Sequence, residues 1–393
     1  MSTLIVPDSN PRPLADGSYD VIVVGARVAG AATAMLLARA GMRTLLLDRG
    51  SPVTDTLSTH ALMRAGVLQL SRWGLLDEIV AAGTPAVRRT TFSYGGEQVR
   101  IDIKPSAGVD ALYAPRRTVL DPLLVRSAVA AGATVHHHTP VTGLLREGRG
   151  RVAGVVATSS TGATVRLRAP LVIGADGMRS TIARLVDAPF TRRGTHAAAV
   201  SYGYWPGLEL DEFRWNFLRH ACSGAIPTND GMTCVFVSAP AHVVGRGGVD
   251  TIIGAVAAAS PELADRLRSG QQPAGTRSFQ GHPGFIRRSH GPGWALVGDA
   301  GCFKDPIGAH GITDALRDAE LLARAVIGGG GDTALAGYEI TRDRVSADLF
   351  DVVDRIAGHA WDETSIGAIL KQLSMAMADE IELLSGLDAE AAA

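Results

Sequence analysis

A glycine-containing turn between an apolar run and an Ala-rich segment restricts the fold of this chain more than any other feature. Residues 20–24 read Asp-Val-Ile-Val-Val, the turn Gly25-Ala-Arg-Val-Ala-Gly30 follows, and residues up to 39 are rich in Ala, Leu and Met. Such a run is typical of a buried parallel strand, and the segment after it, which ends before Gly41, is typical of a helix. Residues 43–48 supply a second apolar run. This order predicts a β-α-β unit with a right-handed crossover.

The turn nearly matches the dinucleotide-binding fingerprint G-x-G-x-x-G. Gly25 would permit the tight turn and Gly30 would let the helix meet the strand, but Arg27 occupies the middle glycine position. Arg27 must therefore adopt a backbone conformation open to a residue with a Cβ, and its side chain must point away from the turn, where it could bind a phosphate. Asp48 lies 23 positions after Gly25, near the spacing of a ribose-binding carboxylate. The alternative is a tight β-α turn followed by a surface aspartate.

Composition excludes several other classes of protein. The 393 residues carry 38 Lys and Arg against 39 Asp and Glu, so a net charge of −1 offers no basic field for nucleic acid. The three cysteines lack CxxC spacing, which excludes a disulfide scaffold and fits the reducing cytoplasm, where we expect the protein. No apolar run reaches the roughly 18 residues of a spanning helix, and no secretory signal pattern is visible, so we expect no stable membrane insertion.

Three distant segments carry a shared pattern. They are Gly25–Gly30 with Asp48, then Gly174-Ala-Asp-Gly-Met-Arg-Ser180, and finally Gly298-Asp-Ala-Gly-Cys-Phe-Lys-Asp-Pro-Ile-Gly-Ala-His-Gly-Ile312. Together they resemble the flavin-dependent monooxygenase superfamily with the para-hydroxybenzoate-hydroxylase-like fold, which also contains geranylgeranyl-reductase-like enzymes and flavin-dependent halogenases. The ending of the third segment most resembles the reductase and halogenase branches. Arg117, with Leu120 and Leu124 after it, resembles the helix whose arginine contacts FAD.

The resemblance implies FAD as the cofactor and NAD(P)H as a transient reductant, and it assigns a role to each matching position. The pyrophosphate would be held by Gly25, Ala26, Arg27, Val28, Ala29 and Gly30. The adenosine half would be bound by Asp48 with the following Arg49, by Arg117 at the phosphates and by Val141 beside the adenine. Asp176 and Gly177 belong to the motif that in the family helps to bind both FAD and the pyridine nucleotide, and Asp299 would bind the ribityl chain or the pyrophosphate of FAD.

The flavin ring would lie against the loop that ends the third segment. Its residues are Pro306, Gly308, Ala309, His310, Gly311 and Ile312. The N–H groups of the helix that follows would stabilise the negative charge of a reduced flavin. Four of the matching positions also have local explanations, because Asp176 with Gly177 is a common turn pair, Asp299 could cap a segment and Pro306 could stiffen a loop.

The fold that we expect is α/β, with a Rossmann-type FAD-binding domain, an inserted mixed β-sheet substrate domain and C-terminal helices. Length alone, at roughly 150 residues per domain, indicates two or three domains. The expected ranges are 1–18 for a flexible leader; 19–90, 112–188 and 285–330 for the FAD-binding domain; 91–111 and 189–284 for the substrate domain; and 331–393 for the helical region. The glycines at 148 and 150 predict a hairpin between two strands.

Two histidines are candidates for acid–base chemistry, and the sequence predicts no metal site. His60 precedes a helix in a region that approaches flavin and substrate in the family, and His310 lies in the flavin loop. Each could instead be a structural histidine. His136, His137 and His138 cannot converge on one metal from a strand, so we expect a solvated strand end. The cysteines, Cys302 included, fit small apolar fillers.

The function that we expect is a monooxygenase that uses FAD, NAD(P)H and O2 on a small apolar substrate, aromatic or polycyclic. Aromatic residues between 202 and 217, such as Tyr202, Tyr204 and Trp215, could line the substrate pocket or form sheet core. One alternative is a flavin-dependent reductase of isolated C=C bonds, and another is a flavin- or NAD-binding regulator without catalysis. A halogenase is less favoured, because the W-x-W-x-I-P signature is absent and Trp215-Asn-Phe217 is the nearest stretch.

Overall fold

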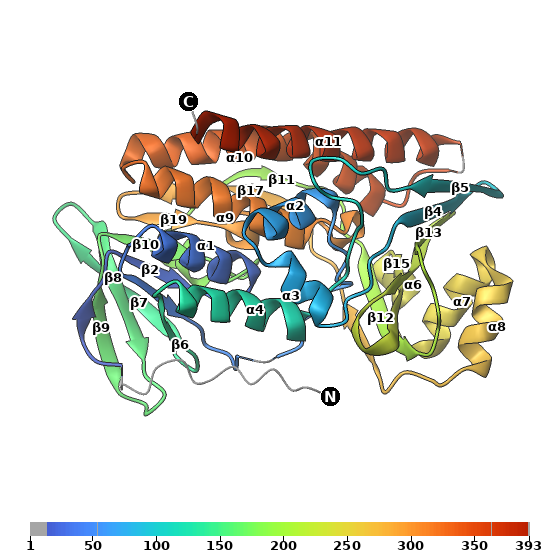
Figure 1. Ribbon diagram of the computed structural model, residues 1–393, viewed down its shortest axis with the longest axis horizontal. Helices are drawn as coiled ribbons and strands as arrows, with labels where there is room; N and C mark the ends of the chain where they lie inside the picture. Colours follow the sequence, from blue (N-terminus) through green and yellow to red (C-terminus); the bar gives the residue numbers. More distant parts are fainter. Residues whose placement is uncertain (1–13, 53, 363, 392–393) are drawn as a thin grey trace.

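Two sheet-based units lie side by side beneath two long C-terminal helices in the computed structural model, which describes residues 14–52, 54–362 and 364–391 (Figure 1). This is the expected α/β class, with several mixed sheets and a helical C-terminus. None of the helices over those residues is both long enough and apolar enough to cross a membrane.

The first unit is built on a six-stranded sheet in the order β18-β19-β10-β2-β3-β6. Its strands are β2 (Val21–Val24), β3 (Thr44–Leu47), β6 (Thr134–His136), β10 (Leu171–Gly174), β18 (His290–Gly291) and β19 (Trp294–Leu296). All pairs are parallel except β18 with β19. Every residue of β2, β3 and β10 is buried, which explains their continuous apolar runs.

Alternate side chains of β2 face two different cores. Val21 and Val23 pack against helices, whereas Ile22 and Val24 pack against a second, smaller sheet. The helices of the first unit are α1 (Val28–Arg39), α2 (Arg64–Arg72), α3 (Leu76–Ala81), α4 (Arg117–Ala130), α5 (Thr181–Leu185) and α9 (Gly311–Ile327). The smaller sheet comprises β1 (Gly17–Ser18), β7 (Val141–Glu147), β8 (Arg151–Thr158) and β9 (Thr164–Arg168). The expected hairpin is confirmed by the antiparallel pairing of β7 with β8.

The second unit is a seven-stranded sheet in the order β16-β12-β15-β14-β13-β4-β5. Its strands are β4 (Arg89–Tyr94), β5 (Glu97–Asp102), β12 (Ala199–Pro206), β13 (Phe213–Leu218), β14 (Ala221–Pro227), β15 (Met232–Ala239) and β16 (Thr276–Phe279). The pairing of β4 with β13 is parallel, and it joins the two chain segments that the sequence assigns to an inserted domain. One face packs on α7 (Val249–Ala259) and α8 (Pro261–Ser269), at the far right of Figure 1.

The remaining elements are short. They are α6 (Ala241–Val244), the strands β11 (Phe190–Arg193), β17 (Phe285–Arg287) and β20 (Cys302–Phe303), and the 3₁₀ turns η1 (Asn229–Gly231), η2 (Gly298–Ala300) and η3 (Pro306–Gly308). The strands β11, β17 and β20 form a three-stranded sheet from both expected domains, so backbone pairing crosses the boundary between them.

Helix α11 (Ser365–Ala391) runs along α10 (Asp332–Ala357) and over both units (Figure 1). Near its start, Ile366 and Ile369 are buried in the core beneath the seven-stranded sheet. Near its end, Leu384 is buried among the helices of the first unit. One helix therefore bridges the two apolar cores.

Two local expectations need correction. The leader does not extend to residue 18, because Gly17 and Ser18 pair with β9 and Asp16 accepts a hydrogen bond from Arg166 N; residues 1–13 lie outside the described residues. The strand end at residues 136–138 is solvated only in part. His137 is buried, since the chain turns back at His138, where φ is +52°.

The burial of Leu384 predicts that α11 stabilises the whole chain. Leu384→Ala should lower the free energy of unfolding by roughly 2–5 kcal/mol, because it leaves a cavity in a closed core. Met375→Ala on the same helix is the control: Met375 is 67% exposed, so its truncation should cost under about 0.5 kcal/mol. Urea titrations of both variants measure the difference, and equal effects would contradict the bridging role of α11.

Candidate active site

The turn after β2, Gly25–Gly30, requires glycine at both of its ends and is called the glycine cradle below. At Gly25, where φ is +106°, a Cβ would lie 2.4 Å from the carbonyl oxygen of Ala175, and at Gly30 it would lie 1.8 Å from the carbonyl oxygen of Gly25. Arg27, by contrast, is extended at φ −91°, a conformation open to any residue, as its sequence position requires. Its side chain does not cap α1, so the first N–H groups of that helix can receive a phosphate.

Asp48 ties the end of β3 to this turn. Its Oδ2 accepts a hydrogen bond from Ala26 N at 2.6 Å, and its Oδ1 accepts one from Gly50 N at 2.6 Å. The carboxylate therefore holds the turn in place, and it keeps further lone pairs for a ribose hydroxyl. Arg49, the next residue, is exposed.

A pair of guanidinium groups lies beside the cradle. Arg117, at the start of α4, is buried and binds both oxygens of Asp121, at 2.6 and 2.8 Å. Arg27 Nη1 lies 3.5 Å from the same carboxylate. Two positive charges share one negative charge, so the pair suits the phosphates of a dinucleotide.

Asp176 acts as a helix cap. Its Oδ2 accepts hydrogen bonds from Thr181 N and Ile182 N at the start of α5, and Ser180 donates its hydroxyl to Oδ1. Burial raises the pKa of Asp176, and these hydrogen bonds oppose the rise. Gly177 has φ +78°, as a turn requires. These contacts account for Asp176 and Gly177 as a turn with a helix cap.

Val141, the first residue of β7, packs against the apolar core beside the smaller sheet.

Asp299 remains without a hydrogen bond from any described residue, although it is only partly exposed. Burial, with the nearby charge of Asp314, raises its pKa to about 7. An unpartnered carboxylate at the end of a parallel strand fits a hydroxyl-bearing ligand, which would donate hydrogen bonds to it. The ribityl chain of FAD has this chemistry.

Residues 306–312, called the flavin loop here, make a tight turn and form the start of α9. Asp305 accepts a hydrogen bond from Ile307 N at 2.9 Å and another from Ala198 N at 2.8 Å, so it binds this loop to the start of β12. Ala309 has φ +50°, and a Cβ on Gly311 would meet no described atom within 4 Å. The start of α9 therefore borders open space, in which a flat ring can approach its free N–H groups. The glycine cradle, Asp299 and this open space all fit FAD.

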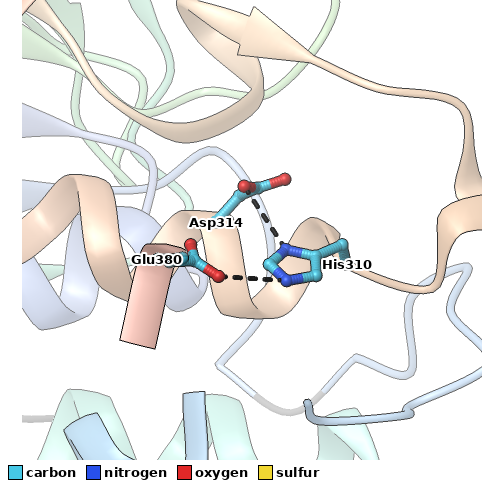
Figure 2. A group of neighbouring side chains, drawn as sticks. All are labelled: His310, Asp314 and Glu380. Atoms are coloured by element: carbon cyan, nitrogen blue, oxygen red, sulfur yellow. Dashed lines mark ion pairs between the residues drawn. The ribbon is translucent and has the colours of Figure 1, made fainter. Parts of the chain in front are cut away.

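His310 points away from open space and into a buried ionic cluster (Figure 2). Its Nδ1 lies 3.4 Å from Asp314 Oδ1, and its Nε2 lies 3.1 Å from Glu380 Oε2 of α11. Burial alone would lower the pKa of His310, but the two carboxylates outweigh it and raise the pKa to about 9. The structure thus gives both ring nitrogens carboxylate partners, where the sequence predicts contact with flavin or substrate.

These three side chains are close enough to hold a metal ion, since their ligand atoms lie within 4.8 Å of one another. Protein cations already balance the carboxylates, however. Arg317 Nη1 lies 2.7 Å from Asp314 and 2.8 Å from Glu380. Lys304 Nζ lies 2.8 Å from Asp314. Ion pairs therefore balance these carboxylates, while His310 Nδ1 and Nε2, Asp314 Oδ1 and Glu380 Oε2 make no hydrogen bond to a described residue.

His60 occupies a second buried position, between the two units. It has φ +68°, its Nε2 hydrogen-bonds the hydroxyl of Tyr204, and its ring stacks on that of Tyr204 with centroids 5.6 Å apart. Its Nδ1 has no hydrogen-bond partner among the described residues. Burial, with the charges of Arg116 and other arginines, holds the pKa of His60 well below its usual value, so the ring is neutral. Strain and an unpartnered buried nitrogen are common at functional sites.

Two residues beside His60 and Tyr204, namely Arg116 and Asp55, are not predicted from the sequence. The guanidinium carbon of Arg116 lies 3.8 Å from the centroid of the Tyr204 ring, and Arg116 Nη2 forms an ion pair with Asp55 at 2.8 Å. The only available signal was that Arg116 precedes Arg117 in the sequence. Tyr204 was among the aromatic candidates, and burial raises its pKa.

The aromatic residues of the seven-stranded sheet face both ways. One face, toward the first unit, carries Tyr202, Phe213, Trp215 and Phe217. Ile307 and Ala309 of the flavin loop pack against this face. Trp205 packs on the opposite face, against α7 and α8. The cluster that contains Tyr202 and Trp215 also includes partly exposed side chains, such as Met63 and Tyr204. This face of the sheet therefore forms part of the apolar core and also borders the flavin loop. The cysteines are buried, as expected of fillers.

Two hollows lie elsewhere on the surface. One, of about 500 Å³, lies beside Val21 and Leu171 at the amino ends of β2 and β10, at the edge of the sheet opposite the cradle. The other, of about 210 Å³, lies between Trp205 and the end of α8. Neither includes a residue of the cradle, so the proposed site rests on the convergence of residues described above.

Comparisons with known proteins agree on the cofactor and the fold. The family model described as an FAD binding domain matches residues 18–353. Digeranylgeranylglycerophospholipid reductase 1 of Methanococcoides burtonii is 26% identical over 92% of this chain and 85% of its own. The 6-methylpretetramide 4-monooxygenase of Streptomyces rimosus is 29% identical, over 79% and 76%. The structure of P. aeruginosa PqsL in complex with 2-aminobenzoylacetate is 20% identical with a TM-score of 0.77, over 90% and 100%, which shows a shared fold.

The glycine cradle generates a direct prediction. Gly30→Ala should abolish FAD binding and lower the free energy of unfolding by roughly 1–3 kcal/mol, because the new methyl group collides with backbone rather than with a side chain. Fluorescence quenching of added FAD and thermal unfolding measure the two effects. Gly254→Ala is the control, because Gly254 lies in an exposed part of α7 and a new Cβ there would have no atom within 4 Å. This variant should bind FAD like wild type and should not lower the free energy of unfolding.

Replacement of Asp299 should have opposite effects on the stability of the chain without FAD and on its affinity for FAD. Its pKa is raised to about 7 in the folded chain, so the chain without FAD loses stability as pH rises from about 4 through 7. Asp299→Asn should therefore stabilise that form at pH 8, by on the order of 1 kcal/mol, while it weakens FAD binding. Thermal unfolding at pH 5 and pH 8, with and without FAD, tests this. A variant less stable than wild type at pH 8 without FAD would contradict it.

Proposed function

Because this chain belongs to the FAD-binding-domain family and is an FAD-dependent oxidoreductase, we propose that it is a monooxygenase that uses NAD(P)H and O2 to oxygenate an apolar, aromatic or polycyclic small molecule. The observation that carries the proposal is the packing of Ile307 and Ala309, from the loop expected to meet the flavin ring, against an aromatic sheet face. A flat, apolar substrate suits such a face. The similarity to the Streptomyces rimosus monooxygenase supports the same reaction class.

When bound, FAD supplies the electron transfer and the activation of oxygen. The chain's own residues bind and orient the two reactants. Arg27 and Arg117 would hold the phosphates of FAD, and the free N–H groups at the start of α9 would interact with its ring. The apolar residues around Ile307 exclude water from the reacting atoms.

His60 and Tyr204 are the polar groups that this proposal places beside the substrate. His60 is neutral and Tyr204 keeps its proton, so the two side chains form an uncharged hydrogen-bonded pair that can orient a substrate through hydrogen bonds. Arg116 lies over the face of the Tyr204 ring, and its positive charge partly offsets the rise in the pKa of Tyr204 that burial causes.

A second candidate is a flavin-dependent reductase of isolated C=C bonds. The specific observation in its favour is the similarity to the archaeal reductase, which extends over 92% of the chain. The two reactions differ in one consumed reactant, because a monooxygenase uses O2 and a reductase does not. A regulator without catalysis would bind flavin and turn over neither.

Oxygen consumption therefore tests the proposal. Purified protein should be yellow, and a substrate found by screening polycyclic phenols for stimulated NAD(P)H oxidation should cause O2 uptake in proportion to NAD(P)H. Gly30→Ala, prepared in parallel, is the control for free flavin. Substrate-dependent NAD(P)H oxidation that continues unchanged without O2 would instead identify the reductase, and a colourless protein that takes up no FAD would remove both.

A further inference from the structure

Glu380 of α11 is a buried carboxylate far from the cradle in sequence, and it reaches the flavin loop. It is 1% exposed, its Oε2 lies 3.1 Å from His310 Nε2 and its Oε1 lies 2.8 Å from Arg317 Nη1. Helix α11 starts at Ser365, beyond residue 353, where the match to the family model ends. This contact therefore connects the shared FAD-binding region to a segment outside it.

His310 connects the loop to that helix at a sensitive point. It is the residue immediately before α9, and it follows Ala309, whose backbone is left-handed at φ +50°. Its ring is bound on one side by Asp314, one turn into α9, and on the other by Glu380 (Figure 2). A side chain tethered on both sides restrains the direction in which residues 308–312 enter the helix.

We propose that Glu380 is a positioning residue which, through His310, holds residues 308–312 in the conformation that receives the flavin ring. The proposal rests on the proposed function only in placing the ring of FAD against this loop. Glu380 itself touches no part of the cofactor in this proposal, so its effect is transmitted by His310.

The surrounding charges indicate what happens when one tether is removed. Two charged groups among the described residues contact His310: Asp314 of α9 and Glu380 of α11. Beyond them, Lys304 pairs with Asp314, Arg317 pairs with Asp314, Asp318 and Glu380, and Asp299 of η2 is under the influence of the Asp314 charge. In Glu380→Gln, Arg317 keeps its ion pairs with Asp314 and Asp318, and Lys304 keeps its ion pair with Asp314. The cluster therefore remains assembled, while His310 loses its charged partner on α11.

The tether depends on pH because His310 must be charged for both ion pairs. The carboxylates of Glu380 and Asp314 outweigh burial and raise its pKa to about 9, so the ring is a cation at neutral pH and loses its proton as pH rises through 9. Removing the Glu380 charge should move that transition to lower pH. A purely structural role of Glu380 would not move a pH profile of cofactor binding.

The test is a titration of FAD binding from pH 6.5 to 10 on full-length wild type, Glu380→Gln, His310→Gln and Glu320→Gln. Glu320 is the matched control: it is a buried carboxylate on α9 that binds Trp73 and Arg324, not the flavin loop. The readouts are the dissociation constant of FAD, the visible spectrum of bound FAD and the thermal midpoint without FAD.

Wild type should bind FAD more weakly above about pH 9. Glu380→Gln should bind about tenfold more weakly at pH 7.5, with its transition at lower pH and a changed visible spectrum. His310→Gln should bind weakly at every pH without a transition. Glu320→Gln should match wild type in FAD binding, even where its thermal midpoint falls.

Two results would overturn the proposal: a Glu380→Gln variant that binds FAD no differently from Glu320→Gln, or a wild-type profile without a transition between pH 8 and 10. If Glu380→Gln does not fold, the wild-type profile and His310→Gln decide the question. Failure of wild type to bind FAD at any pH would count against the proposed function instead, and is recognised by the absence of any flavin spectrum.

Discussion

The close approach of α1 to the end of β2 is the contact on which the rest of the molecule depends. Two glycines allow it, since a methyl group on Gly30 would lie 1.8 Å from the carbonyl oxygen of Gly25. The approach orients the free N–H groups of α1 toward the carboxyl edge of the sheet, where Asp48 fixes the turn and Asp299 ends a neighbouring strand segment. The cofactor site is therefore a consequence of how one helix packs against one strand.

The second unit gives this edge its chemistry. Its mixed sheet places aromatic side chains on the face toward the flavin loop, and Asp305 binds that loop to the residue before β12. Above both units, α11 buries Ile366 in one core and Leu384 in the other. Glu380 lies between these anchors, so the same helix that joins the cores also contacts the loop at His310.

Much of the candidate site could be predicted, because its positions are set by local backbone requirements. Gly30 is required by its contact with Gly25 five positions earlier, Gly25 by the positive φ of the turn, and Asp48 lies at a strand end. Contact with the distant Ala175 only adds to the requirement at Gly25. The histidines could not be predicted in the same way. The surroundings of His310 include Glu380, 70 positions later, and those of His60 include Tyr204, so their ionisation depends on contacts made only in the folded chain.

From its order of residues alone, the chain determines a parallel β-α-β unit, a dinucleotide turn and a helical C-terminus, because periodicity, apolar runs and glycines act over a few neighbouring residues. Tertiary structure alone decided that β4 pairs with β13, that His310 lies between the carboxylates of Asp314 and Glu380, and that Arg116 covers Tyr204. The physical reason is distance along the chain: these contacts join segments separated by tens to more than a hundred residues, and only packing of the whole molecule brings them within reach.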